Sequence, residues 1–224
     1  SLVTGDGANV SASNASAFGT ESTIWSGATY SYAYGYDSLV YIGAENAIAS
    51  GTQANALANN SMAMGMQAQT GGANSIAIGF NARTYGTSDH QQSVNSIAVG
   101  ISSRANGANS MAYGSMANAN GANAIAFGAN SSSNGPNTSA SGTNARAIGF
   151  NAIADGTDAL AEGRNVIAIG VGAKALGYNT NVVSIGTDGF AEGTNVVALG
   201  AASRAIGSNG LAIGTCAYAQ GSNV

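Results

Sequence analysis

The chain has 224 residues, a mass of 21.8 kDa and a formal net charge of −4, with 6 Lys and Arg against 10 Asp and Glu. So few basic residues exclude a nucleic-acid-binding surface. A single Pro excludes a collagen-like helix, and a single Cys excludes a disulfide scaffold or a Cys-rich zinc site. No apolar run reaches transmembrane length, so we expect no membrane insertion by this part of the protein.

Residues 1–55 form the first predicted segment, and their glycine spacing and aromatic residues set them apart. Glycines recur there every eight residues, at positions 19, 27, 35, 43 and 51. The alternation of the tyrosines predicts one aromatic face of a strand, with the tryptophan beside it; these residues are Trp25, Tyr30, Tyr32, Tyr34 and Tyr36. Two interpretations are open: a tip that binds a ligand through these aromatic side chains, or a cap over the open end of the following repeats.

Residues 56–224 form the second predicted segment, a repeat with a period of fourteen residues. Glycines fall every seven residues over most of it, and two types of sequence alternate between them, as in residues 74–79 (NSIAIG) and 82–86 (ARTYG). Each type alternates with a period of two and closes on Gly, which predicts a strand followed by a turn. Glycine at this frequency would also destabilise a helix by about 1 kcal/mol per residue. Two strands and two turns predict one coil of an all-β parallel β-roll, or β-solenoid, with about eleven coils from roughly residue 60 to 221.

Two insertions interrupt the glycine spacing. Residues 87–93 add seven residues, and two more are added near residues 178–179. The first insertion is predicted to bulge from the edge of one coil, as a second candidate contact site. His90 lies in it beside Asp89, and a solvated loop explains this pair better than a metal or catalytic site.

The alternation sorts the side chains of each strand into inward and outward columns. The positions four and two residues before each Gly are small, as in Ser75 and Ala77 or Ala82 and Thr84. Because two sheets joined by short turns lie close together, we assign these columns to the interior. The outward columns of the second strand of each coil are mostly polar, which predicts a solvated face.

The outward columns of the first strand of each coil are apolar and form a continuous stripe. A stripe of this size is not left in water, and each side chain contributes about 1.5–3 kcal/mol on burial. An interior of Ala and Ser is too thin to stabilise the chain alone, so we predict an obligate homo-oligomer. Its core residues are Ile76, Ile78, Ile97, Val99, Ile125, Phe127, Ile167, Ile169, Val183, Ile185, Val197, Leu199, Leu211 and Ile213.

Asparagine recurs five residues before the Gly that closes the first strand of each coil, as at Asn60, Asn74 and Asn95. This column is either a ladder of ligand-binding side chains or a stack at a tight turn. Turn chemistry explains it fully, because Asn tolerates a left-handed backbone and its side chain bonds to nearby groups.

The repeat in residues 74–86 resembles the head repeat of trimeric autotransporter adhesins, the YadA-like head, over about residues 52–223. The resemblance implies a left-handed parallel β-roll in which three chains pack into a homotrimer with the apolar stripe around the threefold axis. It also implies display outside the cell on a bacterial surface, anchored to the outer membrane through parts absent from this sequence. Such heads bind host or target molecules, so we expect a surface protein or a glycan as partner.

The leading functional prediction is therefore an adhesin head, a binding module without catalysis and without a cofactor or metal. The alternative is a structural spacer, including a segment of a phage-like or predatory-bacterial fibre, that displays a separate binding tip. Ice binding would need a flat outward ladder of Thr, whereas the outward columns mix Arg, Tyr, Asn and Glu. An enzyme is the least supported class, because no cluster of titratable residues is evident.

Overall fold

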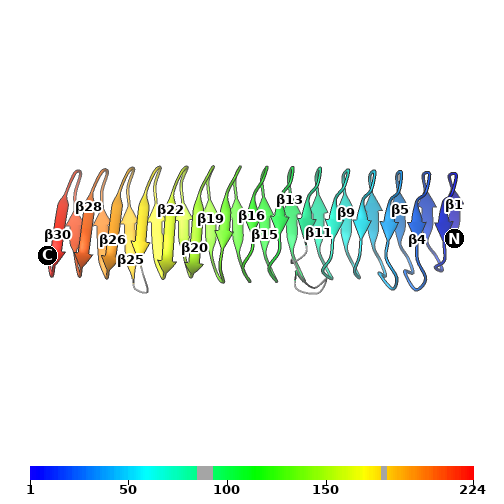
Figure 1. Ribbon diagram of the computed structural model, residues 1–224, viewed down its shortest axis with the longest axis horizontal. Helices are drawn as coiled ribbons and strands as arrows, with labels where there is room; N and C mark the ends of the chain where they lie inside the picture. Colours follow the sequence, from blue (N-terminus) through cyan, green and yellow to red (C-terminus); the bar gives the residue numbers. More distant parts are fainter. Residues whose placement is uncertain (85–92, 178–180) are drawn as a thin grey trace. The chain divides into compact units, whose positions relative to one another are not determined.

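The computed structural model describes residues 1–84, 93–177 and 181–224, and every regular element within them is a short β-strand. The chain divides into two compact units, Ser1–Met116 and Ala117–Val224. In each unit the odd-numbered strands stack in one parallel sheet, here called the odd-strand sheet, and the even-numbered strands stack in an even-strand sheet (Figure 1). The two units together make about 15 coils, which confirms the prediction of an all-β parallel β-solenoid.

The first unit alternates between its two sheets along the chain. Its odd-strand sheet contains β1 (Leu2–Thr4), β3 (Ser16–Phe18), β5 (Tyr32–Tyr34), β7 (Ile48–Ser50), β9 (Met62–Met64), β11 (Ile76–Ile78), β13 (Ile97–Val99) and β15 (Met111–Tyr113). Its even-strand sheet contains β2 (Asn9–Val10), β4 (Thr23–Ile24), β6 (Leu39–Val40), β8 (Asn55–Ala56), β10 (Gln69–Thr70), β12 (Arg83–Thr84) and β14 (Arg104–Ala105).

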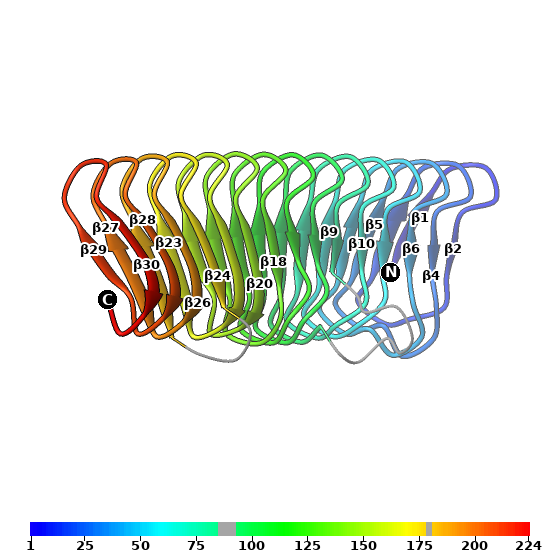
Figure 2. The same cartoon turned by 60° about the vertical axis from the view of Figure 1, so that its left-hand side comes forward.

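The second unit has the same order but longer even-numbered strands. Its even-strand sheet contains β16 (Asn118–Ala119), β18 (Ser132–Asn134), β20 (Arg146–Phe150), β22 (Leu160–Arg164), β24 (Lys174–Gly177), β26 (Phe190–Thr194), β28 (Arg204–Ser208) and β30 (Tyr218–Ser222). Its odd-strand sheet contains β17 (Ile125–Phe127), β19 (Ser139–Ser141), β21 (Ile153–Asp155), β23 (Val166–Ile169), β25 (Val182–Ile185), β27 (Val196–Leu199) and β29 (Leu211–Ile213). Figure 2 shows the sheets of each unit as two layers joined by the turns.

The interior between the two sheets is filled by small side chains, as the sequence predicted. Ala77, Ala82 and Thr84 are completely buried, and so are most Ala and Ser residues of the inward columns. Larger interior residues are few; in the second unit Val166, Val182 and Val196 follow one another in register on β23, β25 and β27. The small interior lets the two sheets approach closely, and it leaves the larger apolar residues to the outside.

One of the two glycines in each coil follows from the geometry of the turn after the odd-numbered strand. Gly79 follows β11 with a φ of +127°, and a Cβ atom there would lie 2.5 Å from the carbonyl oxygen of Gly100 in the next coil. Residues with a side chain rarely adopt this φ, and the neighbouring backbone already occupies the space of the Cβ atom. Glycine is therefore required once in each coil at this position.

The asparagine column lies at the opposite turn and supports the turn interpretation. Asn60, Asn74 and Asn95 have φ values of 54–57°, in the left-handed region that Asn tolerates. The Asn60 side-chain amide donates a hydrogen bond to Asn74 Oδ1 (3.0 Å), and the Asn74 amide donates to Asn95 Oδ1 (3.1 Å). These bonds connect neighbouring coils, so the Asn side chains bond to one another within the stack of turns.

Residues 1–55 belong to the same two sheets, and their eight-residue glycine spacing comes from two longer coils. Ser16 pairs with Tyr32 and Tyr32 pairs with Ile48, so each of these coils has two more residues than the fourteen of the regular repeat. The extra residues lie in the turn after the even-numbered strand, where Ala28 and Ala44 are buried. The eight-residue glycine spacing therefore results from a larger turn within the same kind of coil.

The predicted insertion at residues 87–93, with Asp89 and His90, lies outside the described residues except for Ser93, and so do residues 178–180. The hydroxyl of Ser93 donates a hydrogen bond to the carbonyl oxygen of Thr84 (2.5 Å). Thr84 and Ser93, the described residues on the two sides of the gap, are therefore in direct contact.

Candidate interaction surfaces

The outward face of the odd-strand sheets carries all the residues predicted for an oligomer core. In the first unit Ile76 aligns with Met62 and Ile97, and Ile78 aligns with Met64 and Val99, so two apolar columns cross the strands. The second unit repeats these columns on β23 to β29. Many of the side chains are exposed in the single chain: Ile78 is 37% exposed and Ile213 is 64% exposed. Their burial between chains stays a prediction.

A polar interruption crosses these columns in the second unit. Ser139 and Ser141 on β19 follow Ile125 and Phe127 in register, and Asp155 on β21 follows Ser141. The aliphatic columns resume at once, because Asp155 pairs with Ile169 on β23. The break therefore interrupts both columns at β19 but only one column at β21, where Ile153 follows Ser139.

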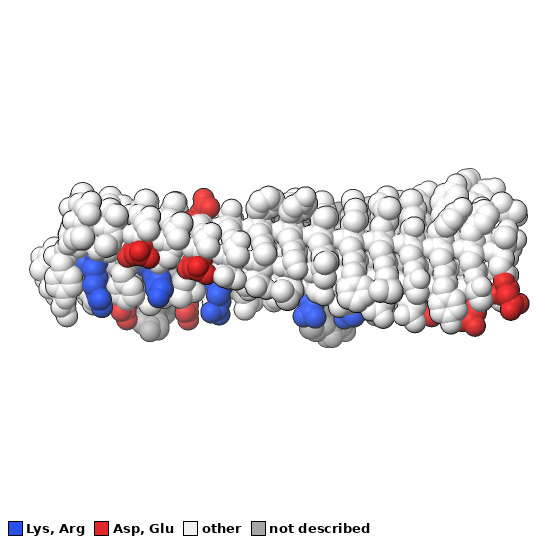
Figure 3. Space-filling view, turned by 90° about the horizontal axis from the view of Figure 1, so that it is seen from above, with Lys and Arg blue, Asp and Glu red and all other residues white. Residues whose placement is uncertain are grey.

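Charge is distributed unequally between the two faces. All six Lys and Arg residues lie on even-numbered strands, whereas Asp155 is the one charged residue among the outward positions of the described odd-numbered strands. In the view of Figure 3, taken for each unit separately, most charged side chains lie towards one long edge. The odd-strand face is thus apolar and nearly uncharged.

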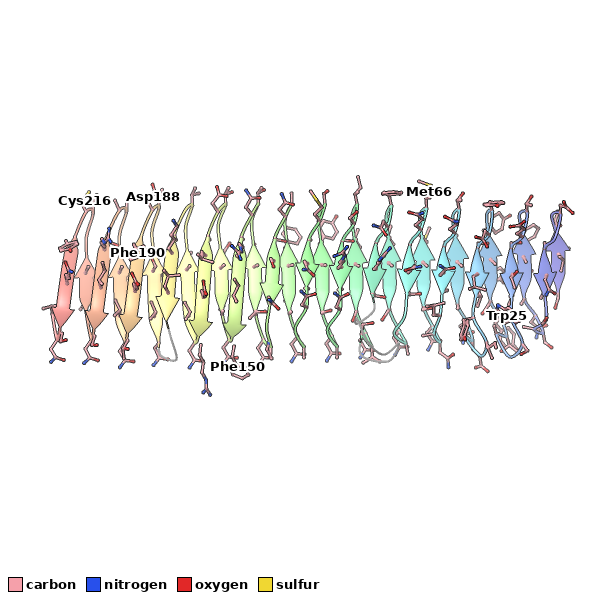
Figure 4. All side chains as sticks on the ribbon, in the orientation of Figure 1. Trp25, Met66, Phe150, Asp188, Phe190 and Cys216 are labelled. Atoms are coloured by element: carbon pink, nitrogen blue, oxygen red, sulfur yellow. The ribbon has the colours of Figure 1, made fainter. Side chains whose placement is uncertain are left out.

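The aromatic residues predicted to bind a ligand lie on different parts of their coils. Tyr32 and Tyr34 point outward from β5, in the same columns as the predicted oligomer core, and the Tyr34 ring stacks on Phe18 with centroids 4.8 Å apart. Tyr30 lies in the asparagine turn with a φ of 58°, and Tyr36 follows Gly35 in the opposite turn. The chain turns at both ends of β5, so the four tyrosines do not share one strand face. Trp25 follows β4 on the even-strand side and is 45% exposed (Figure 4).

A polar groove of about 610 Å³, which the sequence pattern did not predict, borders Trp25 in the first unit. Trp25 and Asp37 line it together with a series of amide side chains and Arg83: Gln53, Asn55, Gln67, Gln69 and Arg83. The Gln67 amide donates to Gln53 Oε1 (3.2 Å), whereas Arg83 Nε is buried with no hydrogen-bond partner among the described residues. The outward polar columns of the even-numbered strands were visible in the sequence. The groove itself forms only because the preceding turns place Asp37, Gln53 and Gln67 beside those columns.

A second groove of about 610 Å³ crosses β20, β22 and β24 in the second unit. Ile148, Glu162 and Leu176 are in register along it, and Gly149, Gly163 and Gly177 form the next row. The Arg164 guanidinium lies 5.5 Å from the centre of the Phe150 ring. The even-strand face is less polar here than predicted, because Ile148 and Leu176 occupy outward positions that are polar or charged in other coils.

The described residues contain no group of three or more His, Cys, Asp or Glu side chains that could hold a metal ion. Within the same residues, no helix is long and apolar enough to cross a membrane. Cys216 is an exposed free thiol in the turn after β29, at the same edge as Asp188 (Figure 4).

Comparison with known families agrees with the repeated coils of the fold. The family model of the YadA head domain repeat (2 copies) matches residues 43–68, 60–82, 71–88, 92–117, 105–131, 119–145, 140–165, 161–188 and 191–217. These segments cover well over half of the chain, so the chain belongs to the YadA head family, as its resemblance predicted. Heads of this family are adhesin modules and are in general non-catalytic. No curated protein matches the chain.

Proposed function

We propose that the chain is the head of a trimeric autotransporter adhesin, displayed on a bacterial surface, that binds a host or target molecule without catalysis. One observation carries this proposal: a chain built from YadA head repeats presents an apolar, nearly uncharged face across its odd-numbered strands. Such a face is unstable in water, whereas the even-strand face carries all the basic residues.

Three copies of the odd-strand face form the trimer core in this proposal. Burying an Ile or Val side chain contributes about 1.5–3 kcal/mol, and the face offers two such side chains in most coils. Tyr32 and Tyr34 lie in the same columns and become part of this core. Of the other predicted aromatic residues, Tyr30 and Tyr36 lie in the turns that flank β5, and Trp25 lies on the even-strand side, where it borders the polar groove.

The polar groove beside Trp25 is the proposed ligand site, and a glycan is the ligand class that fits it. An exposed indole ring supplies a flat apolar surface with one hydrogen-bond donor. The surrounding amides, Asp37 and Arg83 supply donors and acceptors that match sugar hydroxyls. Arg83 lines the same groove and brings a positive charge to it.

The proposal is tested with the purified trimer on a glycan array and a panel of matrix proteins. We expect a glycan to bind and a Trp25→Ala variant to bind it about tenfold or more weakly, which corresponds to about 1.4 kcal/mol. The matched control is Tyr218→Ala, because Tyr218 is also an exposed aromatic residue on an even-numbered strand but lies in the other unit. Both variants are first shown to sediment like the unmodified protein.

If the Trp25→Ala variant binds as tightly as the control, the groove is not the ligand site. If the unmodified trimer binds nothing, the spacer alternative is favoured, in which regular coils hold a separate binding domain away from the cell.

A further inference from the structure

The odd-strand face of the second unit repeats almost the same apolar layer from coil to coil, so it does not by itself fix how two copies align. Along β23, β25, β27 and β29 the outward pairs are all aliphatic: Ile167 and Ile169, Val183 and Ile185, Val197 and Leu199, Leu211 and Ile213. Neighbouring coils are about 4.8 Å apart. Two copies that slip by one coil would therefore meet an aliphatic layer almost identical to the correct one.

The polar interruption is the feature of this face that is not repeated from coil to coil. Ser139 and Ser141 replace a bulky pair; in the next coil Asp155 follows Ser141, whereas the apolar Ile153 follows Ser139. Aliphatic or aromatic pairs lie on both sides, with Phe127 before the interruption and Ile169 after it. The two serines are half-buried and Asp155 is exposed in the single chain, so all three can meet a second chain.

We propose that Ser139, Ser141 and Asp155 form a hydrated polar layer that sets the axial register in which copies of this chain associate. This inference rests on the proposed trimer and deepens it. The partner is a second and third copy of the same chain, because the layer is recognised best by its own equivalent.

In register, the polar layers of the three chains lie at the same height. Serine side chains are much smaller than the Phe and Ile side chains beside them, so the layer leaves room for water, which polar groups retain in a protein interior. Water hydrates the Asp155 carboxylates and screens their mutual repulsion. Apart from Asp155, the outward positions of the described odd-numbered strands carry no charge, so no ion pair competes with this arrangement.

A slip by one coil destroys the layer. Asp155 of the displaced chain then lies against the Ile167 and Ile169 layer of the others, where its carboxylate is dehydrated without a partner. The opposite slip places Asp155 of the displaced chain against Ser139 and Ser141 of the others. The serines of the displaced chain then lie beside Ile125 and Phe127, so the bulky side chains of the three chains no longer pack against one another. A polar residue within an apolar seam sets register in coiled coils by the same logic, at a cost in stability.

The experiment compares the unmodified chain with a filled variant, Ser139→Ile, Ser141→Ile and Asp155→Ile. Molecular mass is measured by sedimentation, and ¹³C-methyl NMR is recorded on Ile-labelled protein. Three chains in register are equivalent and give one signal for each Ile methyl group, whereas slipped chains are inequivalent and give several. The matched control is Ser132→Ile, Glu162→Ile and Ser208→Ile, which places the same residue types on the even-strand sheet.

We expect the unmodified chain and the control to be trimeric, with one signal per Ile methyl group. The filled variant is expected to stay trimeric and to show additional signals for Ile169, Ile185 and Ile213, each of about a tenth of the main intensity or more. A trimeric filled variant with single signals would overturn the register proposal and leave the trimer standing. An unmodified chain that sediments as a monomer would overturn both.

Discussion

At the scale of single residues, the two kinds of glycine in the turns have different physical causes. Gly79 combines a φ of +127° with a Cβ position that the backbone of the next coil already occupies. Gly43 has a φ of +71° but open space around the Cβ position. Any other residue at position 79 would have a strained backbone and a Cβ atom that overlaps the next coil. At position 43 another residue would have only an unfavourable backbone conformation.

A Gly79→Ala substitution is therefore expected to destabilise the protein by about 3 kcal/mol or more, because it adds a steric overlap to a strained backbone. Gly43→Ala, the matched control, is expected to cost about 1–2 kcal/mol. Denaturant unfolding at one fixed protein concentration measures both. Equal losses for the two variants would show that the neighbouring coil yields readily at Gly79.

At the scale of strands, the sequence predicted the faces well where each coil follows the repeat and less well where it departs from it. Ser75 and Ala77 point inward as predicted, because the alternation and the small side chains give the same answer. On the even-numbered strands of the second unit, Ile148 and Leu176 point outward, because the strand direction sets orientation whatever the polarity of the residue. The groove beside Trp25 could not be predicted, since it depends on how turn and strand residues of several coils come together.

The valine column inside β23, β25 and β27 predicts an effect on stability. Val182→Ala removes two buried methyl groups between Val166 and Val196 and is expected to cost about 2 kcal/mol. Val171→Ala, at a site that is 53% exposed, is expected to change stability by less than about 0.5 kcal/mol. Thermal unfolding at equal concentration compares them. A loss at Val182 as small as that at Val171 would mean that the two sheets close over the cavity, as they do in coils with Ala or Ser in this column.

At the scale of the whole molecule, the proposed trimer explains why a chain with so thin an interior is stable. The interior consists mostly of Ala and Ser, and the larger apolar residues of the odd-numbered strands face outward. Stability and assembly are then one process, so unfolding depends on protein concentration. The sequence alone predicted self-association from the apolar columns, whereas the number of chains comes from the family and not from the pattern.

Charge placed on the odd-strand face tests this arrangement. The double variant Ile76→Asp and Ile78→Asp is expected to shift the protein from three chains towards one, because two carboxylates per chain would be buried without partners. The control Asn55→Asp and Gln69→Asp adds the same charge on the even-strand sheet and is expected to remain trimeric. Analytical ultracentrifugation distinguishes the two. Trimers of both variants with equal stability would place the interface elsewhere on the surface.

The direction of the hydrogen bonds between coils has a mechanical consequence. Backbone bonds such as those from Ile125 N to Thr138 O and from Ser139 N to Ala152 O (both 2.9 Å) connect successive coils of the second unit. A tensile force applied along the stack loads these bonds end to end, so coils detach one after another and do not shear together. Each fourteen-residue coil that detaches releases about 45–50 Å of extended chain. Under flow, a head built in this way would dissipate the work done by the pulling force in many small steps, one per detached coil, before its attachment failed.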